Sequence, residues 1–425
     1  MKRPARWLAS VGALVVVTSG GWMARADVKP GDVVTAANVD QAKDLISPGL
    51  EWCVRRGMPL RVIEPRKIEW PKAYKEATEK YSGQVKLSAD GLKLENYVAG
   101  LPFPKIDPND PQAALKIMWN YDYKFLTTDD VDLREFDADT GPIGSGGSGM
   151  GIERHFILDH FRRLFYTGRL YVDPKPERSN PDGIRFRESL HPILEPFDLK
   201  GVGATSIRYI DSSKQDDSWL YLPSLRRVRR LSTAQRSDAL FGQDTDVDSY
   251  YGYSGHTAWM EWKLLGEKTI LACMHGEQYP VKWGDGSADF SFDDKWEKRD
   301  VWVLEGVSKL PQYAYSKRII FMDKEAWVVP YSDIYDRPGQ LWKIWINLFS
   351  FKKHPFPGAR LSVYEDEMGF VPAIVMVDMQ LVHATRAALP SQKVAGSEGW
   401  FFNMGEKSGV TEDWFQIAHL IEAGH

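Results

Sequence analysis

LWKIWINLF, residues 341–349, has the period-2 alternation of a β-strand, with every second residue large and apolar. A second stretch, IVMVDMQLVH at residues 374–383, repeats the pattern and places Asp378 and Gln380 on the opposite face. Repeated alternation predicts antiparallel strands in a large sheet with one apolar face. The side chains predicted to share that face are Trp342, Ile344, Ile346, Leu348, Val375, Val377, Met379 and Leu381.

The remaining sequence pattern divides the chain into three regions. Residues 1–26 have the pattern of a leader, and residues 27–149 mix short helices with a hairpin and end in a Gly/Ser-rich loop. Residues 150–425 are dominated by strands and end in a helix that Thr411 could cap. The predicted fold class is α+β, mainly antiparallel β, with residues 27–149 and 150–425 forming either two regions or one continuous domain. Within the mixed region, helices are predicted at residues 39–46, 71–81 and 111–120, and a hairpin at residues 84–97.

The first residues have the composition of a secretory signal peptide. Lys2, Arg3 and Arg6 precede an apolar stretch too short to span a bilayer, and Ala24 to Ala26 supply the small-residue cleavage pattern. We therefore expect cleavage near Ala26 and a soluble periplasmic protein. The chain has 54 Lys and Arg against 58 Asp and Glu. Because four of the basic residues lie in the leader, the mature protein is net acidic, which disfavours nucleic acid as a partner.

A cluster of arginines follows a predicted hairpin corner, YLPSL at residues 221–225. Alternation places arginine on both faces of the returning strand, so this strand cannot lie wholly in the core. We interpret the cluster as a basic rim, and its members are Arg226, Arg227, Arg229 and Arg230. A simpler alternative is surface ion pairing with the three aspartates of residues 244–248, which would contribute little stability.

Other motifs lack the context that their chemistry requires. GSGGSG, residues 144–149, matches a dinucleotide-binding motif without the flanking strand and helix. GYSGH, residues 252–256, has His256 where a nucleophile elbow needs glycine. Residues 244–248 have the D-x-D-x-D spacing of a calcium loop but lack its glycine and its glutamate, which favours a solvated acidic loop. We therefore expect no catalytic residue, metal or cofactor.

The two cysteines, Cys53 and Cys273, leave two alternatives open. In an oxidising compartment they could form a disulfide, or they could be two separate buried thiols. A disulfide requires Cα atoms within about 7 Å of each other, and the sequence does not give that distance.

Long segments of the chain resemble a known family. WLYLPSLRRVRRLS followed by RSDALFGQDTDVDS resembles the exported Gram-negative family catalogued as domain of unknown function 1329, and PFDLKGVGATSIRY, LLGEKTIL and YSKRIIFMDKEAW extend the match in order. The resemblance covers most of the mature chain. It also implies distant similarity to LolA-like outer-membrane lipoprotein-sorting proteins through Tyr221 to Pro223, Arg229-Arg230 and Gly242 to Asp244. It implies an incomplete, half-open β-barrel with covering helices and an apolar cavity for acyl chains, and it assigns no catalytic residue.

The leading hypothesis is a non-enzymatic periplasmic carrier or chaperone that binds a lipid or acyl chain in envelope transport. Its expected partners are this hydrophobic ligand and an envelope transporter or outer-membrane protein, and not nucleic acid. In this hypothesis the eight apolar side chains of residues 342–381 named above line the concave interior. Two alternatives remain: a periplasmic hydrolase with a dispersed active site that includes residues such as Asp378 and His383, and a structural envelope protein without a small ligand.

Overall fold

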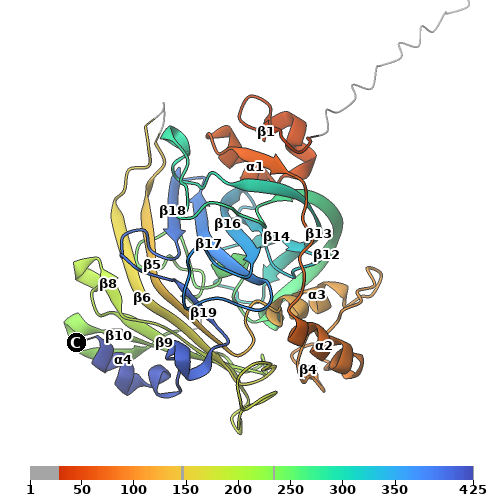
Figure 1. The fold of residues 1–425 in the computed structure, drawn as a ribbon, viewed down its shortest axis with the longest axis vertical. Helices are drawn as coiled ribbons and strands as arrows, with labels where there is room; N and C mark the ends of the chain where they lie inside the picture. The colour runs from red at the N-terminus through yellow and green to blue at the C-terminus, as the bar shows by residue number, and fades with distance from the viewer. Residues whose placement is uncertain (1–27, 145–147, 233–234, 425) are drawn as a thin grey trace, which may run out of the picture.

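The computed structural model describes residues 28–144, 148–232 and 235–424, so the predicted leader, residues 1–26, lies outside the described residues. One sheet of 17 strands dominates the molecule, and a separate two-stranded hairpin, β3 (Lys86–Leu87) and β4 (Leu94–Glu95), lies near α2 (Figure 1). The strands of the large sheet are β1 (Val33–Val34), β2 (Leu60–Ile63), β5 (Asp130–Pro142), β6 (Arg154–Phe165), β7 (Ile184–Leu190), β8 (Ile193–Glu195), β9 (Gly203–Tyr209), β10 (Asp217–Leu222), β11 (Arg227–Arg230), β12 (Met260–Ala272), β13 (Lys295–Ser308), β14 (Lys317–Asp323), β15 (Tyr331–Tyr335), β16 (Leu341–Lys352), β17 (Met368–Asp378), β18 (His383–Ala388) and β19 (Trp400–Phe402).

The pairing of these strands produces an open barrel. From one edge to the other the order is β11, β10, β9, β7, β6, β5, β18, β17, β16, β15, β14, β13 and β12. These pairs are antiparallel, whereas the short β2 pairs with β13 in parallel. Within the described residues no ladder joins β11 to β12, so the barrel does not close. The predicted fold class, a mainly antiparallel, half-open β-barrel with covering helices, is confirmed.

The two alternating stretches form the antiparallel neighbours β16 and β17. Their register pairs Ile344 with Val377 and Ile346 with Val375, so the predicted apolar face exists. Every residue of β17 is buried, however, and so are nine successive residues of β16 on both faces. The prediction of one apolar face is wrong for this pair, because both faces are covered. α1 packs against β16, and so does the loop before β12.

Short helices cover the sheet in several places. The α-helices are α1 (Pro48–Arg55), α2 (Lys72–Tyr81), α3 (Ala113–Asp122) and α4 (Ile417–Ala423). The 3-10 helices are η1 (Val39–Leu45), η2 (Ser82–Gln84), η3 (Phe197–Leu199), η4 (Pro223–Leu225), η6 (Tyr250–Gly252), η7 (Thr257–Trp259), η8 (Gly286–Ala288), η9 (Gly405–Ser408) and η10 (Asp413–Phe415). The predicted helices at residues 71–81 and 111–120 are α2 and α3, and the one at residues 39–46 is the tighter η1. In the described part of the chain, no helix is long and apolar enough to cross a membrane.

The helix α1, which the sequence pattern did not predict, is attached to the sheet by a buried carboxyl group. Ser47 caps the helix and donates a hydrogen bond of 2.9 Å to Asp333 of β15. Gly49 donates its backbone N–H to the same side chain, and a Cβ at Gly49 would lie 2.4 Å from Asp333. Burial raises the pKa of Asp333 to about 7. Only glycine therefore allows α1 to pack this closely against β15.

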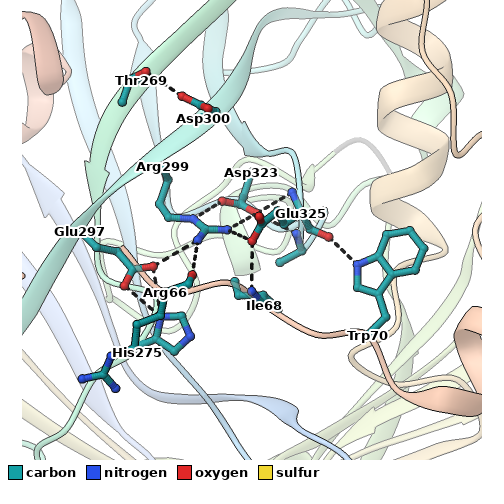
Figure 2. Close-up of polar contacts among 11 residues, drawn as sticks. Arg66, Ile68, Trp70, Thr269, His275, Glu297, Arg299, Asp300, Asp323 and Glu325 are labelled. Atoms are coloured by element: carbon teal, nitrogen blue, oxygen red, sulfur yellow. Dashed lines mark hydrogen bonds and ion pairs between the residues drawn. The ribbon is translucent and has the colours of Figure 1, made fainter. Parts of the chain in front are cut away.

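A buried arginine attaches the segment between β2 and α2 to the barrel (Figure 2). Arg299 of β13 donates hydrogen bonds to Asp323 at 2.8 Å, to Glu325 at 2.8 Å and to the carbonyl oxygen of Arg66 at 2.7 Å. The other carboxylate oxygen of Asp323 accepts a hydrogen bond from the backbone N–H of Glu325 at 2.9 Å, which extends this network. The indole of Trp70, for example, donates to the carbonyl oxygen of Glu325 at 2.6 Å. One guanidinium thus joins two neighbouring strands to an N-terminal segment more than 200 positions earlier in the chain.

The C-terminal helix begins later than the sequence pattern predicted. Thr411 caps no helix; η10 is followed by α4, which begins after Gln416. In Figure 1, α4 lies beside β9 and β10, and both strands contact it. The break allows Trp414 to pack under Arg162, whose guanidinium carbon lies 3.6 Å from the centre of the ring.

The predicted division at residue 150 falls between β5 and β6, which pair along ten positions. β5 also pairs with β18 and β19, and β2 pairs with β13, so residues before 150 contribute to the same sheet as residues after it. We propose on this basis that the two regions form one continuous domain, the alternative left open by the sequence.

Candidate functional site

A cavity of about 420 Å³ lies against one face of the sheet. Its wall is built by β5, β6, β7, β9 and β10, by β16, β17 and β18, and by the loop between β11 and β12, residues 231–259. We call this loop the cover loop. Most of the larger side chains in the wall are apolar: Leu133, Phe136, Leu158, Phe161, Leu190, Leu220, Leu240, Phe241, Trp345, Val371, Ile374 and Leu389. The arrangement can remove an apolar molecule from water.

One pair of oppositely charged side chains in the wall joins β6 to β7. Arg163 of β6 donates a 2.8 Å hydrogen bond from Nε to Glu188 of β7. Its guanidinium carbon also lies 4.3 Å from the ring centre of Phe186. On the adjoining strands β9 and β10, Ser206 and Ser218 are cross-strand neighbours whose small side chains leave space in the cavity. The wall is therefore apolar over most of its surface, with polar groups near β6 and β7 and others, such as Arg236 and Asp238, on the cover loop.

The cover loop places two aromatic residues of the wall in an unusual backbone conformation. Phe241 has a φ of 53° and Tyr251 a φ of 57°, both in the left-handed region that side-chain-bearing residues rarely adopt. Such a conformation costs on the order of 1–3 kcal/mol for each residue and persists only where surrounding contacts over-determine it. The cover loop must therefore be fixed by other interactions.

One of these interactions joins the middle of the cover loop to β18. Asp244 accepts hydrogen bonds from His383 Nδ1 at 2.8 Å and from Thr385 Oγ1 at 2.9 Å. Lys343 of β16 donates to the carbonyl oxygen of the same aspartate at 2.8 Å. The hydrogen bond with Asp244, together with its charge and that of Glu153, raises the pKa of His383. The imidazolium form therefore strengthens this attachment.

The other interactions hold Asp246 and Asp248 of the cover loop in buried positions. Asp248 accepts from Arg236 Nε at 2.6 Å and from the hydroxyl of Tyr313 at 3.0 Å. Arg236 also donates to Asp216 of the β9–β10 turn at 3.1 Å. Asp246 accepts a 2.6 Å hydrogen bond from the hydroxyl of Tyr315. The stretch of the cover loop that ends at Asp248 is thus attached to the β9–β10 turn and to the segment before β14 by buried polar contacts.

Comparison with known proteins places the chain in a family. The family described as protein of unknown function (DUF1329) matches residues 33–408, which is most of the chain. The chain belongs to the DUF1329 family. A curated relative, Uncharacterized protein PA3922 of Pseudomonas aeruginosa, is 26% identical over 348 residues, which cover 77% of this chain and 71% of that protein.

Two solved structures are similar to this DUF1329 chain. A domain from Vibrio parahaemolyticus, named as an outer membrane lipoprotein-sorting protein domain, has a TM-score of 0.48 at 16% identity and covers 72% of this chain and 98% of its own. A DUF1329 family protein from Desulfovibrio piger has a TM-score of 0.46 at 14% identity and covers 73% of this chain and 98% of its own.

In this protein, the side chains that the sequence predicted to line a cavity lie elsewhere. None of the eight lines the cavity found against β16 and β17, whose walls instead contain Trp345 and Ile374 from the opposite face. Six of the eight are buried core residues: Ile344, Ile346, Leu348, Val375, Val377 and Met379. Trp342 is half-buried and donates its indole N–H to Asp378, while Leu381 is 72% exposed beyond the end of β17. β16 and β17 border the cavity with the face opposite the predicted one, whereas the predicted face packs against α1.

The four arginines of the basic rim lie on β11 and at the turn that precedes it. All four are exposed, and β11 pairs only with β10 within the described residues. Arg229 is the cross-strand neighbour of Leu220, which lines the cavity, so Arg229 lies on the cavity side of the strand. Arg230 forms an ion pair with Asp217 on β10. The suggested pairing with the aspartates of residues 244–248 is wrong, because those carboxylates are buried and bind other partners.

Replacing both Arg227 and Arg229 by Gln should change stability little. Neither side chain has an ion pair with a described residue, and exposed ion pairs contribute only about 0–1 kcal/mol. We expect the midpoint of urea unfolding to remain within the error of the measurement. A strongly lowered midpoint would show instead that these two arginines are structural.

Residues of the motifs singled out in the sequence form hydrogen bonds within the protein. In GYSGH, the hydroxyl of Ser254 donates to the carbonyl oxygen of Val247, and His256 is buried with a pKa lowered by desolvation to about 4. The loop GSGGSG lies partly outside the described residues. Asp378 and His383 are cross-strand neighbours, but Asp378 accepts from Trp342 while His383 donates to Asp244. The contact of His383 with Asp244 attaches the cover loop to β18, whereas that of Trp342 with Asp378 joins β16 to β17.

The structure also describes the two cysteines and the side chains that could bind a metal ion. Cys53 of α1 and Cys273 after β12 are both free and fully buried, so the disulfide alternative is wrong and the alternative of two separate thiols holds. Burial raises the pKa of both thiols. Among the described residues no group of three His, Cys, Asp or Glu side chains could hold a metal ion.

Proposed function

We propose that this DUF1329 protein is a non-enzymatic periplasmic carrier that binds the apolar part of a lipid or acyl chain. The observation that carries the proposal is the apolar cavity of about 420 Å³, which falls within the ordinary size range of small-ligand sites, about 300–1,000 Å³. Each methylene group moved from water into such a wall contributes about 0.8 kcal/mol. An acyl chain could therefore bind through burial alone.

The position of the cavity also supports a carrier. Its wall includes the cover loop, which joins the edge strands β11 and β12 of the open barrel, so part of the wall is loop rather than continuous sheet. We infer that release of the ligand requires the buried contacts of Asp244, Asp246 and Asp248 to open, because these contacts hold the cover loop on the wall.

The edge strand gives the carrier a surface for a partner. Leu231 lines the cavity and directly follows the exposed arginines of β11. We infer that these arginines face an anionic lipid surface or an acidic envelope protein during transfer, which charge complementarity would favour. The predicted leader supports export to the periplasm.

Titration with N-phenyl-1-naphthylamine, a neutral probe that fluoresces in apolar surroundings, tests this function. We expect saturable binding at one site per protein, and competition by 1-dodecanol, because both molecules would occupy the same cavity. Fluorescence that rises without saturation, or that 1-dodecanol does not reduce, would contradict the carrier function.

A further inference from the structure

A small polar cleft lies next to the apolar cavity. Its volume is about 50 Å³, which is room for a few water molecules or a small charged group at about 10–15 Å³ for each water. Arg163, Tyr251 and Ser254 line both spaces, so the cleft and the cavity adjoin at β6 and at the end of the cover loop. A molecule with an apolar chain and a small polar head would match this pair of spaces.

The cleft has more positive than negative charge. Its three neighbouring arginines each have a carboxylate partner: Arg163 with Glu188 at 2.8 Å, Arg208 with Asp216 at 2.8 Å, and Arg185 with Asp122 at 3.7 Å. The fourth cation is Lys124, which follows α3 and also lines the cleft. No described carboxylate lies within ion-pair distance of its ammonium group, so one positive charge in the cleft is uncompensated.

Lys124 is held in place by neutral groups only. Its ammonium nitrogen donates a 3.0 Å hydrogen bond to the carbonyl oxygen of Tyr121 and lies 3.9 Å from the centre of the Tyr121 ring. Desolvation by the surrounding protein and the nearby charges of Arg163 and Arg185, against the opposing effect of Asp122, together lower the pKa of Lys124 to about 7. A charged lysine in these surroundings is costly unless an anion accompanies it.

We propose that Lys124 and Arg163 bind the anionic head of the ligand, a carboxylate or phosphate, while its acyl chain occupies the apolar cavity. The proposal rests on the carrier function and specifies the ligand class as anionic amphiphiles. The ammonium of Lys124 supplies the charge that has no internal partner. Arg163 stands between the two spaces, and its guanidinium can share donors between Glu188 and a bound anion.

Competition against N-phenyl-1-naphthylamine tests the head-group site with two ligands of equal chain length, dodecanoate and 1-dodecanol. At about pH 6, where Lys124 is charged, the wild-type protein should prefer dodecanoate by about tenfold or more, equivalent to about 1.4 kcal/mol. Lys124→Met should abolish the preference by weakening dodecanoate alone. Lys124→Arg, which keeps the charge, should retain most of it, and so should Lys105→Met, a control at an exposed lysine. Dodecyl phosphate, measured in parallel, shows whether the site favours a phosphate or a carboxylate head.

The pH dependence of the wild-type protein gives a second test that needs no variant. Tyr121, Asp122, Arg163 and Arg185 are the charged or titratable groups that face Lys124. Burial raises the pKa of Asp122 and the charge of Arg185 lowers it. The net pKa lies below its usual value, so Asp122 remains ionised above about pH 6. The preference for dodecanoate should therefore fall as the pH rises through about 7 and Lys124 loses its proton, while binding of 1-dodecanol stays constant.

The outcomes separate this proposal from the carrier function. Equal affinity of the wild type for dodecanoate and 1-dodecanol, or an equal loss of both in Lys124→Met, would overturn the head-group site and leave the carrier function standing. A preference that does not change between about pH 6 and about pH 9 would overturn it as well. Failure of the wild type to bind either molecule would overturn both proposals.

Discussion

Replacing Arg299 by Met should lower the free energy of unfolding by about 3–5 kcal/mol, the usual cost of removing one partner from a buried ion pair. The variant leaves Asp323 buried without its cation, and it removes the donor that binds the carbonyl oxygen of Arg66. Figure 2 shows that this guanidinium lies at the centre of the network. Urea unfolding followed by tryptophan fluorescence measures the loss.

Arg66→Met is the matched control for this prediction. The side chain of Arg66 pairs with Glu277 at the surface, where both groups are about half exposed, 54% and 43%. Its backbone carbonyl still accepts from Arg299 in the variant. We expect a change of about 0–1 kcal/mol. Equal effects of the two substitutions would show that the buried network does not hold the N-terminal segment on the barrel.

Replacing Ser206 by Trp should weaken binding of the neutral probe more than tenfold, because the indole would occupy the space that the ligand needs. Ser206 is half-buried on β9 and lines the cavity opposite Ser218. The side chain would extend into empty space, so the free energy of unfolding should change by no more than about 1–3 kcal/mol, the usual cost of overpacking. Probe titration and urea unfolding are measured on the same preparation.

Ser213→Trp makes the same chemical change outside the cavity. Ser213 is exposed in the turn between β9 and β10. This variant should bind the probe as the wild type does. Undiminished probe binding by Ser206→Trp, in a protein shown to be folded, would mean that the probe occupies another surface and that the cavity has been assigned wrongly.

Strand alternation predicted the class of fold but not the face that lines the cavity. The alternation of β16 and β17 gives their pairing directly, since Ile344 meets Val377 and Ile346 meets Val375. It cannot distinguish a face covered by α1 from a face lining a cavity, because both are apolar. Trp345 and Ile374, on the face opposite the predicted one, were a signal in the same sequence: an apolar residue on each face of two neighbouring strands indicates burial on both sides.

The polar anchors of the cover loop were not predictable from local spacing. Asp246 and Asp248, two positions apart, resemble a solvated acidic stretch, but Asp248 binds Arg236, 12 positions away in the same loop, and Tyr313, 65 positions away. The same holds for Lys124, whose significance depends on the carboxylates that its neighbours already bind. Three-dimensional pairing of charges decides these sites, and one sequence contains no signal for it. Ser47 followed by Pro48 was, by contrast, a local start signal for α1.

Native mass spectrometry of the protein purified without detergent from the cells that produce it tests the central claim most directly. The carrier account predicts that the wild type retains a molecule with an acyl chain at one per protein, and that Ser206→Trp, purified in the same way, contains none or much less. A wild-type protein that carries no such molecule, or a Ser206→Trp variant that retains as much as the wild type, would contradict the claim that this cavity carries a lipid.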